Sequence, residues 1–414
     1  MSTSNSKTKR VLPILFITLF LDMIGTGMIF PIIPILLTDP SSPSFLLHGT
    51  STGMQYLIAG LLTGVFGLMQ FIAAPILGEL SDVYGRKKLL TIGVGVLAIA
   101  QLIFGFAIVI ASIPLLFLSR AIAGLAAANF SIAQATVADV TEPKDRAKNF
   151  GLIGVAFGLG FIVGPLLGGW MLHLTGVASA PFWLAGALGV LNLISITLFM
   201  PETRATSKEA HNFHFLKGIR NIESAIRDKD ARGVYGATFL FQLGFGFFTS
   251  FIGILLVTRF NFSAGAVGTF FGIVGVWVIV TQAFILRIVT RAFTEQKILS
   301  VSVLMLAVGI FMEGFAPNVP FLYTAIPLVA LGVGLSNANF LALVSKSVSA
   351  DKQGAALGIS GSLSALAQGV APLAAGLGAG FFGLQLPFVI GMLLALASWA
   401  ALFVFGKHRV VTSQ

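Results

Sequence analysis

The stretch GELSDVYGRKKLL, residues 78–90, lies between two long apolar runs and decides how the whole chain is interpreted. It contains Asp82, then Gly85, and then three consecutive bases that begin at Arg86. Charged side chains at the rim of a membrane helix are costly unless they are paired. The sequence therefore predicts a short loop between two membrane spans, with its acid and its base paired.

The composition is that of an integral membrane protein. Hydrophobic residues make up 56% of the 414 residues and charged residues only 10%, whereas soluble domains carry about 25% charged residues. The apolar runs divide into about twelve helices of ~20–28 residues each. The predicted spans are residues 11–37, 52–77, 88–111, 114–139, 147–173, 180–200, 234–258, 264–288, 297–316, 319–346, 353–380 and 385–406.

The net charge of +10 is explained by membrane topology rather than by a nucleic-acid partner. All Lys and Arg residues except Arg120 and Arg259 lie at the two termini or in the loops that follow even-numbered spans. Basic residues accumulate in cytoplasmic loops, so both termini are predicted to be cytoplasmic. The first apolar run is longer than the ~7–15 residues of a cleaved signal peptide, and we interpret it as the first span.

Two halves of six spans are predicted on either side of one long polar segment. The amino-terminal bundle comprises residues 1–200, the linker residues 201–233 and the carboxyl-terminal bundle residues 234–414. Short motifs recur about half a chain apart: GLAAANF (124–130) matches GLSNANF (334–340), and GPLLGG (164–169) matches APLAAG (371–376). An internal duplication explains the set, although chance similarity is the alternative for any single match. Repeated halves around a midplane site are common in secondary transporters.

Asp22 is the strongest candidate for a coupling residue. It lies about eleven residues into the first span, roughly 17 Å deep at the helical rise. A carboxylate near the bilayer centre should face the bundle interior, and proton uptake or a cationic partner lowers its cost. We interpret Asp22 as a proton or cation site; the alternative is a static ion pair that fixes helix packing.

Two further ionisable residues lie within predicted spans. Arg120 is deep in span four, and we expect it to pair with Asp22 in one state and to separate from it in another, which would couple the charge of Asp22 to conformation. A permanent salt bridge is the alternative. Glu313 lies four residues before Pro317, near the outer end of span nine, so we expect it to be interfacial and solvated.

Span five, GLIGVAFGLGFIVGPLLGG from Gly151, is rich in small residues. Glycines four apart permit close helix contact, and a proline bends a helix, so packing alone would explain most of this pattern. The ending is more particular: it combines Gly160, Gly164, Pro165, Gly168 and Gly169.

This ending, residues 78–90, LDMIGTGMIFPIIP (21–34) and SRAIAGLAAAN (119–129) together resemble the twelve-span drug/proton antiporters of the major facilitator superfamily, which include tetracycline exporters. The likeness is clearest in the first half and thins in the second. It implies an all-α polytopic membrane protein whose twelve transmembrane helices form two pseudo-symmetric six-helix bundles. Some tetracycline exporters also carry an acid in span three, where residues 89–111 hold none, so tetracycline itself is not implied.

The resemblance also implies a cytoplasmic charge cluster that latches the outward-facing state by joining spans two, four and eleven; its members would be Gly78, Asp82, Gly85, Arg86 and Asp139. Within it, Gly78 would permit close helix approach, Asp82 would accept hydrogen bonds from a helix amino terminus, and Arg86 would bridge two carboxylates. Simple topogenic charge is the better explanation for Lys87 and Lys88.

Polar and aromatic side chains at membrane depth are candidates for a substrate cavity that takes an amphipathic ligand. They are Phe30, Gln70, Asn129, Gln134, Phe157, Gln242, Phe245, Trp277, Asn337 and Gln368. With 38 phenylalanines in the chain, most aromatic residues must face lipid or the core.

The sequence contains no phosphate-binding loop, no metal-ligand cluster and no nucleophile triad, and its lack of cysteine excludes disulfides and cysteine-based metal sites. We therefore expect no enzyme activity, no cofactor and no metal, and an ion gradient as the energy source.

The expected function is export of a hydrophobic or amphipathic small molecule in exchange for protons, by a monomer in the bilayer of a bacterial inner membrane. An importer or facilitator of a metabolite on the same fold, a lipid-translocating variant, and a non-transporting membrane receptor or scaffold are the alternatives.

Overall fold

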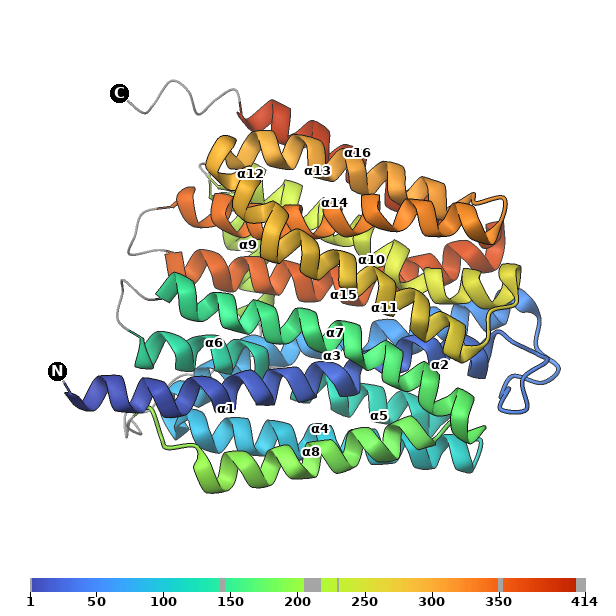
Figure 1. Ribbon diagram of the computed structural model, residues 1–414, viewed down its shortest axis with the longest axis horizontal. Helices are drawn as coiled ribbons and strands as arrows, with labels where there is room; N and C mark the ends of the chain where they lie inside the picture. Colours follow the sequence, from blue (N-terminus) through green and yellow to red (C-terminus); the bar gives the residue numbers. More distant parts are fainter. Residues whose placement is uncertain are drawn as a thin grey trace.

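The computed structural model describes residues 2–127, 129–141, 146–204, 217–228, 231–348 and 353–406. Within these residues, twelve helical segments are long and apolar enough to cross a membrane, and they lie side by side in one elongated bundle (Figure 1). The prediction of an all-helical protein with twelve spans is confirmed. The chain begins and finishes at the same end of the bundle (Figure 1), which we call the terminal end; the opposite end is the far end.

The first half contributes the first six spans. Span one consists of α1 (Ser2–Gly27) and α2 (Ile29–Leu37), and span four of α5 (Ile113–Ala126) and α6 (Asn129–Val140). The other four are single helices: α3 (Thr52–Tyr84), α4 (Arg86–Val109), α7 (Arg146–Thr175) and α8 (Ala180–Phe199).

The second half follows the linker helix α9 (Lys217–Arg227) and has the same plan. Its spans are α10 (Arg232–Phe260), α11 (Ala264–Val280) continued by the π-helical turn η2 (Thr281–Ile285) and α12 (Leu286–Ala292), α13 (Glu295–Gly314), α14 (Val319–Lys346), α15 (Gln353–Phe382) and α16 (Leu386–Gly406).

The packing of one half repeats in the other, as expected for a duplicated chain. Span three packs on spans four and six in the first half, where α4 contacts α5 and α8, and span nine does the same in the second, where α13 contacts α14 and α16. Span one packs on span five (α1 on α7), and span seven on span eleven (α10 on α15). Gly124 and Gly334, which the sequence repeat aligns, contact α3 and η2 respectively, and these belong to the equivalent spans two and eight. The two pseudo-symmetric bundles are therefore confirmed.

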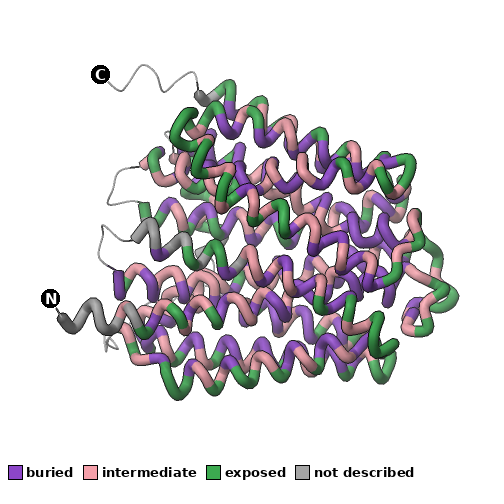
Figure 2. Tube along the Cα trace, viewed as in Figure 1, coloured by how far each residue is buried: buried purple, intermediate pink, exposed green. Residues whose placement is uncertain are grey.

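The bundles meet along two equivalent seams. One seam is formed by α3 and α15, and the other by α7 and α11. Buried residues concentrate inside the bundle and exposed ones on its outermost faces (Figure 2). Large apolar side chains such as Leu198, Phe199 and Val404 are exposed, which suits helices surrounded by lipid.

Residues 78–90 do not form the short loop that the sequence predicts. Helix α3 continues to Tyr84 and α4 begins at Arg86, so that Gly85 alone separates the two helices. Its φ of +95° lies in a region that glycine adopts without the steric penalty of a side chain. The charges of this segment are therefore held by helices.

Candidate functional site

Asp22 lies in the interior of the amino-terminal bundle, with only 7% of its surface exposed. The side-chain amide of Asn129, on α6, donates a hydrogen bond to Asp22 Oδ2 over 2.9 Å. The amide of Asn192, on α8, donates to Asp22 Oδ1 over a longer 3.5 Å. Two neutral amides, rather than a cation, therefore surround this carboxylate.

The sequence did not point to Asn192, although it is the one asparagine or glutamine in residues 180–199. Its orientation is fixed by Thr18, whose hydroxyl donates to Asn192 Oδ1 over 3.1 Å. Because Asn192 thereby presents its Nδ2 to Asp22, spans one and six are joined by a polar contact at membrane depth. The sequence signal that could have identified Asn192 is that it is a single amide in an otherwise apolar span.

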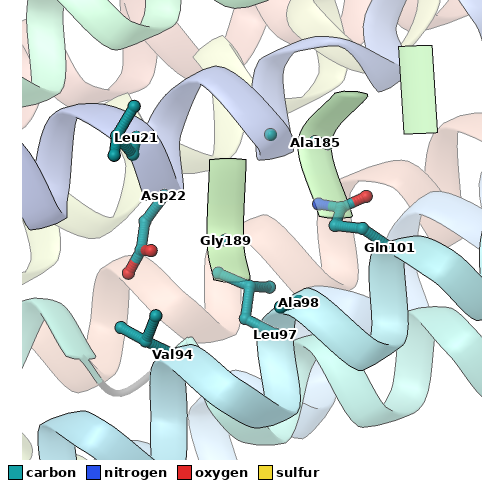
Figure 3. Close-up of a pocket in the computed structure, with 9 residues that line it drawn as sticks. Leu21, Asp22, Val94, Leu97, Ala98, Gln101, Ala185 and Gly189 are labelled. Carbon is teal, nitrogen blue, oxygen red and sulfur yellow. The ribbon is translucent and has the colours of Figure 1, made fainter. Parts of the chain in front are cut away.

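A small cavity adjoins Asp22 between α1, α4 and α8 (Figure 3). In this view Asp22 projects from α1 toward Val94 on α4, and the amide of Gln101 lies at the other end of the group (Figure 3). The volume of the cavity is about 10 Å³, close to the least space that holds a water molecule. The lining residues are Leu21, Asp22, Gly25, Val94, Leu97, Ala98, Gln101, Ala185 and Gly189.

Arg120 is buried on α5 but is not paired with Asp22. Its guanidinium lies over the ring of Phe66 on α3, 4.3 Å from the ring centre, and its Nε has no hydrogen-bond partner among the described residues. Cation–π contact with an aromatic face partly compensates a desolvated guanidinium. A permanent Asp22–Arg120 salt bridge is therefore not formed, and the expected state-dependent pairing stays a prediction.

Arg86 joins spans two and four at the terminal end. Its Nε donates to Asp139 Oδ2, on α6, over 2.9 Å, and its Nη2 lies 2.5 Å from Asp82 Oδ1 on α3. Arg86 is 3% exposed, whereas the side chains of Asp82 and Asp139 are 38% and 23% exposed, so the guanidinium is shielded from water and the acids only in part. Arg204 adds a second cation, 2.8 Å from Asp82. The structure thus brings Asp82, Arg86 and Asp139 together; the part of α15 that it describes contributes no ion pair to them.

Glu202, rather than Asp82, accepts hydrogen bonds from a helix amino terminus. Its Oε1 receives the backbone N–H of Arg86 over 2.9 Å and that of Lys87 over 3.4 Å, where the dipole of α4 favours negative charge. A Cβ at Gly85 would approach Glu202 Oε2 to 2.4 Å. Gly85 is therefore required by its backbone angle, and a side chain there would also displace Glu202. The role we expected for Asp82 belongs to the acid of the PETR segment (201–204).

The span-five glycines hold α7 against α1 and α11. A Cβ at Gly160 would approach the Cβ of Met23 on α1 to 2.4 Å, and one at Gly164 would approach the Cα of Gly27 to 2.9 Å. Gly168 contacts Met28 and Gly169 contacts α11 at Ala264. Pro165 lies inside α7. This motif therefore connects the span that carries Asp22 to the opposite bundle.

The family model of the Major Facilitator Superfamily matches residues 15–229 and 234–413. The chain belongs to the Major Facilitator Superfamily. It is 28% identical to the tetracycline resistance protein, class C, of Escherichia coli over 376 residues, with 89% of each chain covered. It is 30% identical to the class H protein of Pasteurella multocida over 373 residues, with 88% of each covered. The crystal structure of the human organic anion transporter MFSD10 (TETRAN) shares the fold, with a TM-score of 0.73 at 24% identity over 95% of this chain and 99% of that one.

The seam between the halves of this superfamily member is closed at the far end. On α3 and α15, a Cβ at Gly53 would lie 2.6 Å from the oxygen of Gly380, one at Gly60 2.7 Å from the Cα of Gly376, and one at Gly67 2.4 Å from the backbone of Gln368. Backbones this close leave no room for any side chain. The glycines are therefore required for the contact itself.

At the terminal end α3 and α15 lose this close contact, and the linker helix α9 packs on both of them. Gly78 lies three turns beyond Gly67 on the same face of α3, and Gly358 three turns before Gly369 on the same face of α15. A Cβ at either Gly78 or Gly358 would meet no heavy atom within 4 Å. Gly158, three turns before Gly169 on the same face of α7, is likewise free of contact. The close approach we expected at Gly78 is thus absent in this conformation.

The candidate cavity residues do not form one group. Asn129 belongs to the Asp22 site instead. Phe30 contacts Phe161 and Phe271, with ring centres 5.3 and 5.5 Å apart, and so bridges the two halves. Several amides lie along the seam or near it: Gln70, whose Oε1 is buried without a partner among the described residues, the exposed Gln368, and Gln242, which donates to Ser364 over 3.3 Å.

The remaining candidates are less informative. Phe245 stacks on Phe248, Trp277 and Asn337 are exposed and Gln134 is half-buried. The side chain of Phe157 lies outside the described residues. Glu313 contradicts our expectation: it is fully buried rather than solvated.

Proposed function

We propose that this chain exports hydrophobic or amphipathic small molecules in exchange for protons, by alternating access, across a bacterial inner membrane. The observation that carries the proposal is Asp22: a carboxylate 7% exposed, in a membrane span, whose side-chain partners among the described residues are two neutral amides. Such a group is costly unless it takes a proton or binds a cation.

A proton is the ion that fits this environment best. Within the part of the chain that the structure describes, no group of three acidic, histidine or cysteine side chains is placed to hold a metal ion. A sodium or magnesium ion would need several oxygen ligands at once, whereas a proton needs only one carboxylate oxygen. The adjoining cavity of about 10 Å³ is large enough for about one water molecule, which would carry a proton to or from Asp22.

In this proposal, the separation of α3 and α15 at the terminal end indicates which side of the membrane the conformation faces. With both termini in the cytoplasm, the separation at Gly78 and Gly358 makes the conformation inward-facing. Substrate would enter between α3 and α15, past the linker helix α9 that contacts both, and reach Gln70 and Gln368 near the point where the seam closes. The relatives named tetracycline resistance proteins support export of a drug-like molecule.

A second candidate is export of an organic anion, and one observation favours it. Arg120 is buried, its Nε has no partner in the described residues, and it faces an aromatic ring. An unpaired guanidinium of this kind is suited to a carboxylate on a substrate. The two substrate classes are distinguished by whether cells that express the protein exclude a cationic or an anionic dye.

The test is dye accumulation in pump-depleted bacteria, with ethidium as the cationic dye and fluorescein as the anionic one. Cells would express the wild type, Asp22→Asn or Asp39→Asn, with and without a protonophore. Asp39 is the matched control, because it is a half-buried acid that follows the same span and whose carboxylate accepts hydrogen bonds from Ser41. We expect lower accumulation only in energised cells with the wild type or Asp39→Asn. Equal accumulation of both dyes in all cells would contradict proton-driven export of either class.

A further inference from the structure

Glu313 lies at the far end of α13, one residue before the helix finishes at Gly314. Its relative exposure is 0%. Neither Oε1 nor Oε2 has a hydrogen-bond partner among the described residues. It is thus a buried carboxyl group that the described surroundings do not satisfy, in the bundle opposite to Asp22.

The ionisable groups that could face Glu313 belong to the helices that pack on α13, which are α10, α12, α14 and α16. Helix α16 carries no ionisable side chain in its described residues. The ionisable residues of α14 lie elsewhere: Tyr323 packs on Phe270 and Lys346 pairs with Glu295 at the terminal end. Those of α12 and of the first turns of α10 also lie at the terminal end; they are Arg287, Arg291, Arg232 and Tyr235.

Among the cations of these neighbouring helices Arg259 remains, and it bonds to the backbone of the residue that follows Glu313. It is in the last turn of α10, and its Nη1 donates to the backbone oxygen of Gly314 over 3.2 Å. Its guanidinium carbon lies over the ring of Phe260, 5.4 Å from the ring centre. In this conformation the guanidinium is therefore one residue away from a carboxyl group that has no partner.

We propose that Glu313 is a second proton-binding site of this transporter, protonated in the conformation described, and that Arg259 becomes its partner when the far end opens. An ionised carboxylate without donors or a cation would be strongly disfavoured in this apolar setting. The described residues offer no group of three acidic, histidine or cysteine side chains that would hold a metal ion instead. Arginine presents several donors in a fork, so a guanidinium that leaves the carbonyl of Gly314 can bond the carboxylate at two points.

The consequence is one exchangeable carboxyl group in each bundle. Asp22 is in the amino-terminal bundle and Glu313 is near the far end of the carboxyl-terminal bundle, where the seam is closed in this conformation. Opening of the far end would expose Glu313 to the outside and let Arg259 take up the charge as the proton leaves. The coupling role of Glu313 rests on the proposed export, whereas its protonation does not.

The experiment is carbodiimide labelling of purified protein in nanodiscs, because carbodiimides react with protonated carboxyl groups in apolar surroundings. Adducts on wild-type peptides are mapped by mass spectrometry across a pH series, and infrared spectra of the same samples report the carbonyl band of protonated acids. Glu313→Gln is compared with Glu295→Gln, an acid on the same helix that pairs with Lys346.

We expect an adduct on Glu313 at neutral pH, and loss of one acid carbonyl band in Glu313→Gln but not in Glu295→Gln. In Arg259→Gln the adduct should persist to higher pH, because the carboxylate has lost its partner. A wild type with no adduct on Glu313 at any pH would overturn the proposal, and this readout needs no variant to fold. Neither measurement involves a substrate, so failure of the export proposal would be recognised separately.

Discussion

Asn129 donates its side-chain N–H to Asp22 over 2.9 Å, and this bond ties span four to span one inside the amino-terminal bundle. The contact makes the charge of Asp22 sensitive to the relative position of the two spans. Asn129 in turn packs against Gly93 on α4, where a Cβ would lie only 2.0 Å from Asn129 Oδ1. Three spans therefore meet at one hydrogen bond.

Gly93→Ala and Asn129→Ala should both remove the hydrogen bond between Asn129 and Asp22. The added methyl group would displace the amide from Asp22, and loss of a hydrogen bond to a charged group is worth about 1.5–3 kcal/mol. We expect both variants to slow proton-driven transport by roughly tenfold or more, the equivalent of 1.4 kcal/mol per factor of ten. Gly95→Ala on the same helix is the control, because its Cβ would meet Leu193 at an ordinary 3.6 Å. Equal rates in Gly93→Ala and Gly95→Ala would show that the Asn129 contact is not used.

The glycine seam predicts opposite effects at its two ends. Gly67→Ala would force a methyl group into the backbone of α15, and overpacking of this kind costs about 1–3 kcal/mol. Its thermal midpoint in detergent should fall. Gly78→Ala has free space and gains helix propensity of about 1 kcal/mol, so its midpoint should not fall, yet its transport should slow because the seam can no longer close there. Normal transport by Gly78→Ala would contradict closure at this point.

Arg86 should not be replaceable by lysine. It bonds to Asp139 and Asp82 at once and is almost completely buried, and one ammonium group cannot reproduce two directed contacts of a planar guanidinium. We expect Arg86→Lys and Arg86→Gln to lose transport to a similar extent. Arg204→Gln should lose less, since Arg204 is 45% exposed and exposed ion pairs contribute little. Dye efflux from preloaded cells measures the difference, and full rescue by lysine would refute the two-contact role.

Membrane orientation can be tested directly because the chain contains no cysteine. Ser41, at the far end, and Ser224, on the linker helix α9, are both replaced by cysteine in separate variants. In intact cells a membrane-impermeant maleimide should label Ser41→Cys only, and after lysis it should label both. Labelling of Ser224→Cys in intact cells would place the termini outside and reverse the orientation.

Hydropathy predicted the twelve spans well because the thickness of the bilayer imposes their length. Which side of each span faces the interior of the bundle was not predictable in the same way. Glu313 lies close to a helix end along the chain, which suggested exposure, yet it is fully buried because α13 packs on several other helices. Asn192 and Glu202 were missed for a related reason, since each acts on a residue more than a hundred positions away. Residues 78–84 were assigned to a loop because their polarity hid a helix that continues to Tyr84.

The central claim is that Asp22 carries the proton that drives export, and proton movement in proteoliposomes tests it most directly. Purified wild type, Asp22→Asn and Asp39→Asn would be reconstituted with a pH-sensitive dye inside, and ethidium would be added outside. We predict ethidium-dependent proton flux for the wild type and Asp39→Asn, and none for Asp22→Asn, which should still bind ethidium. Equal proton flux with Asp22→Asn would contradict the account.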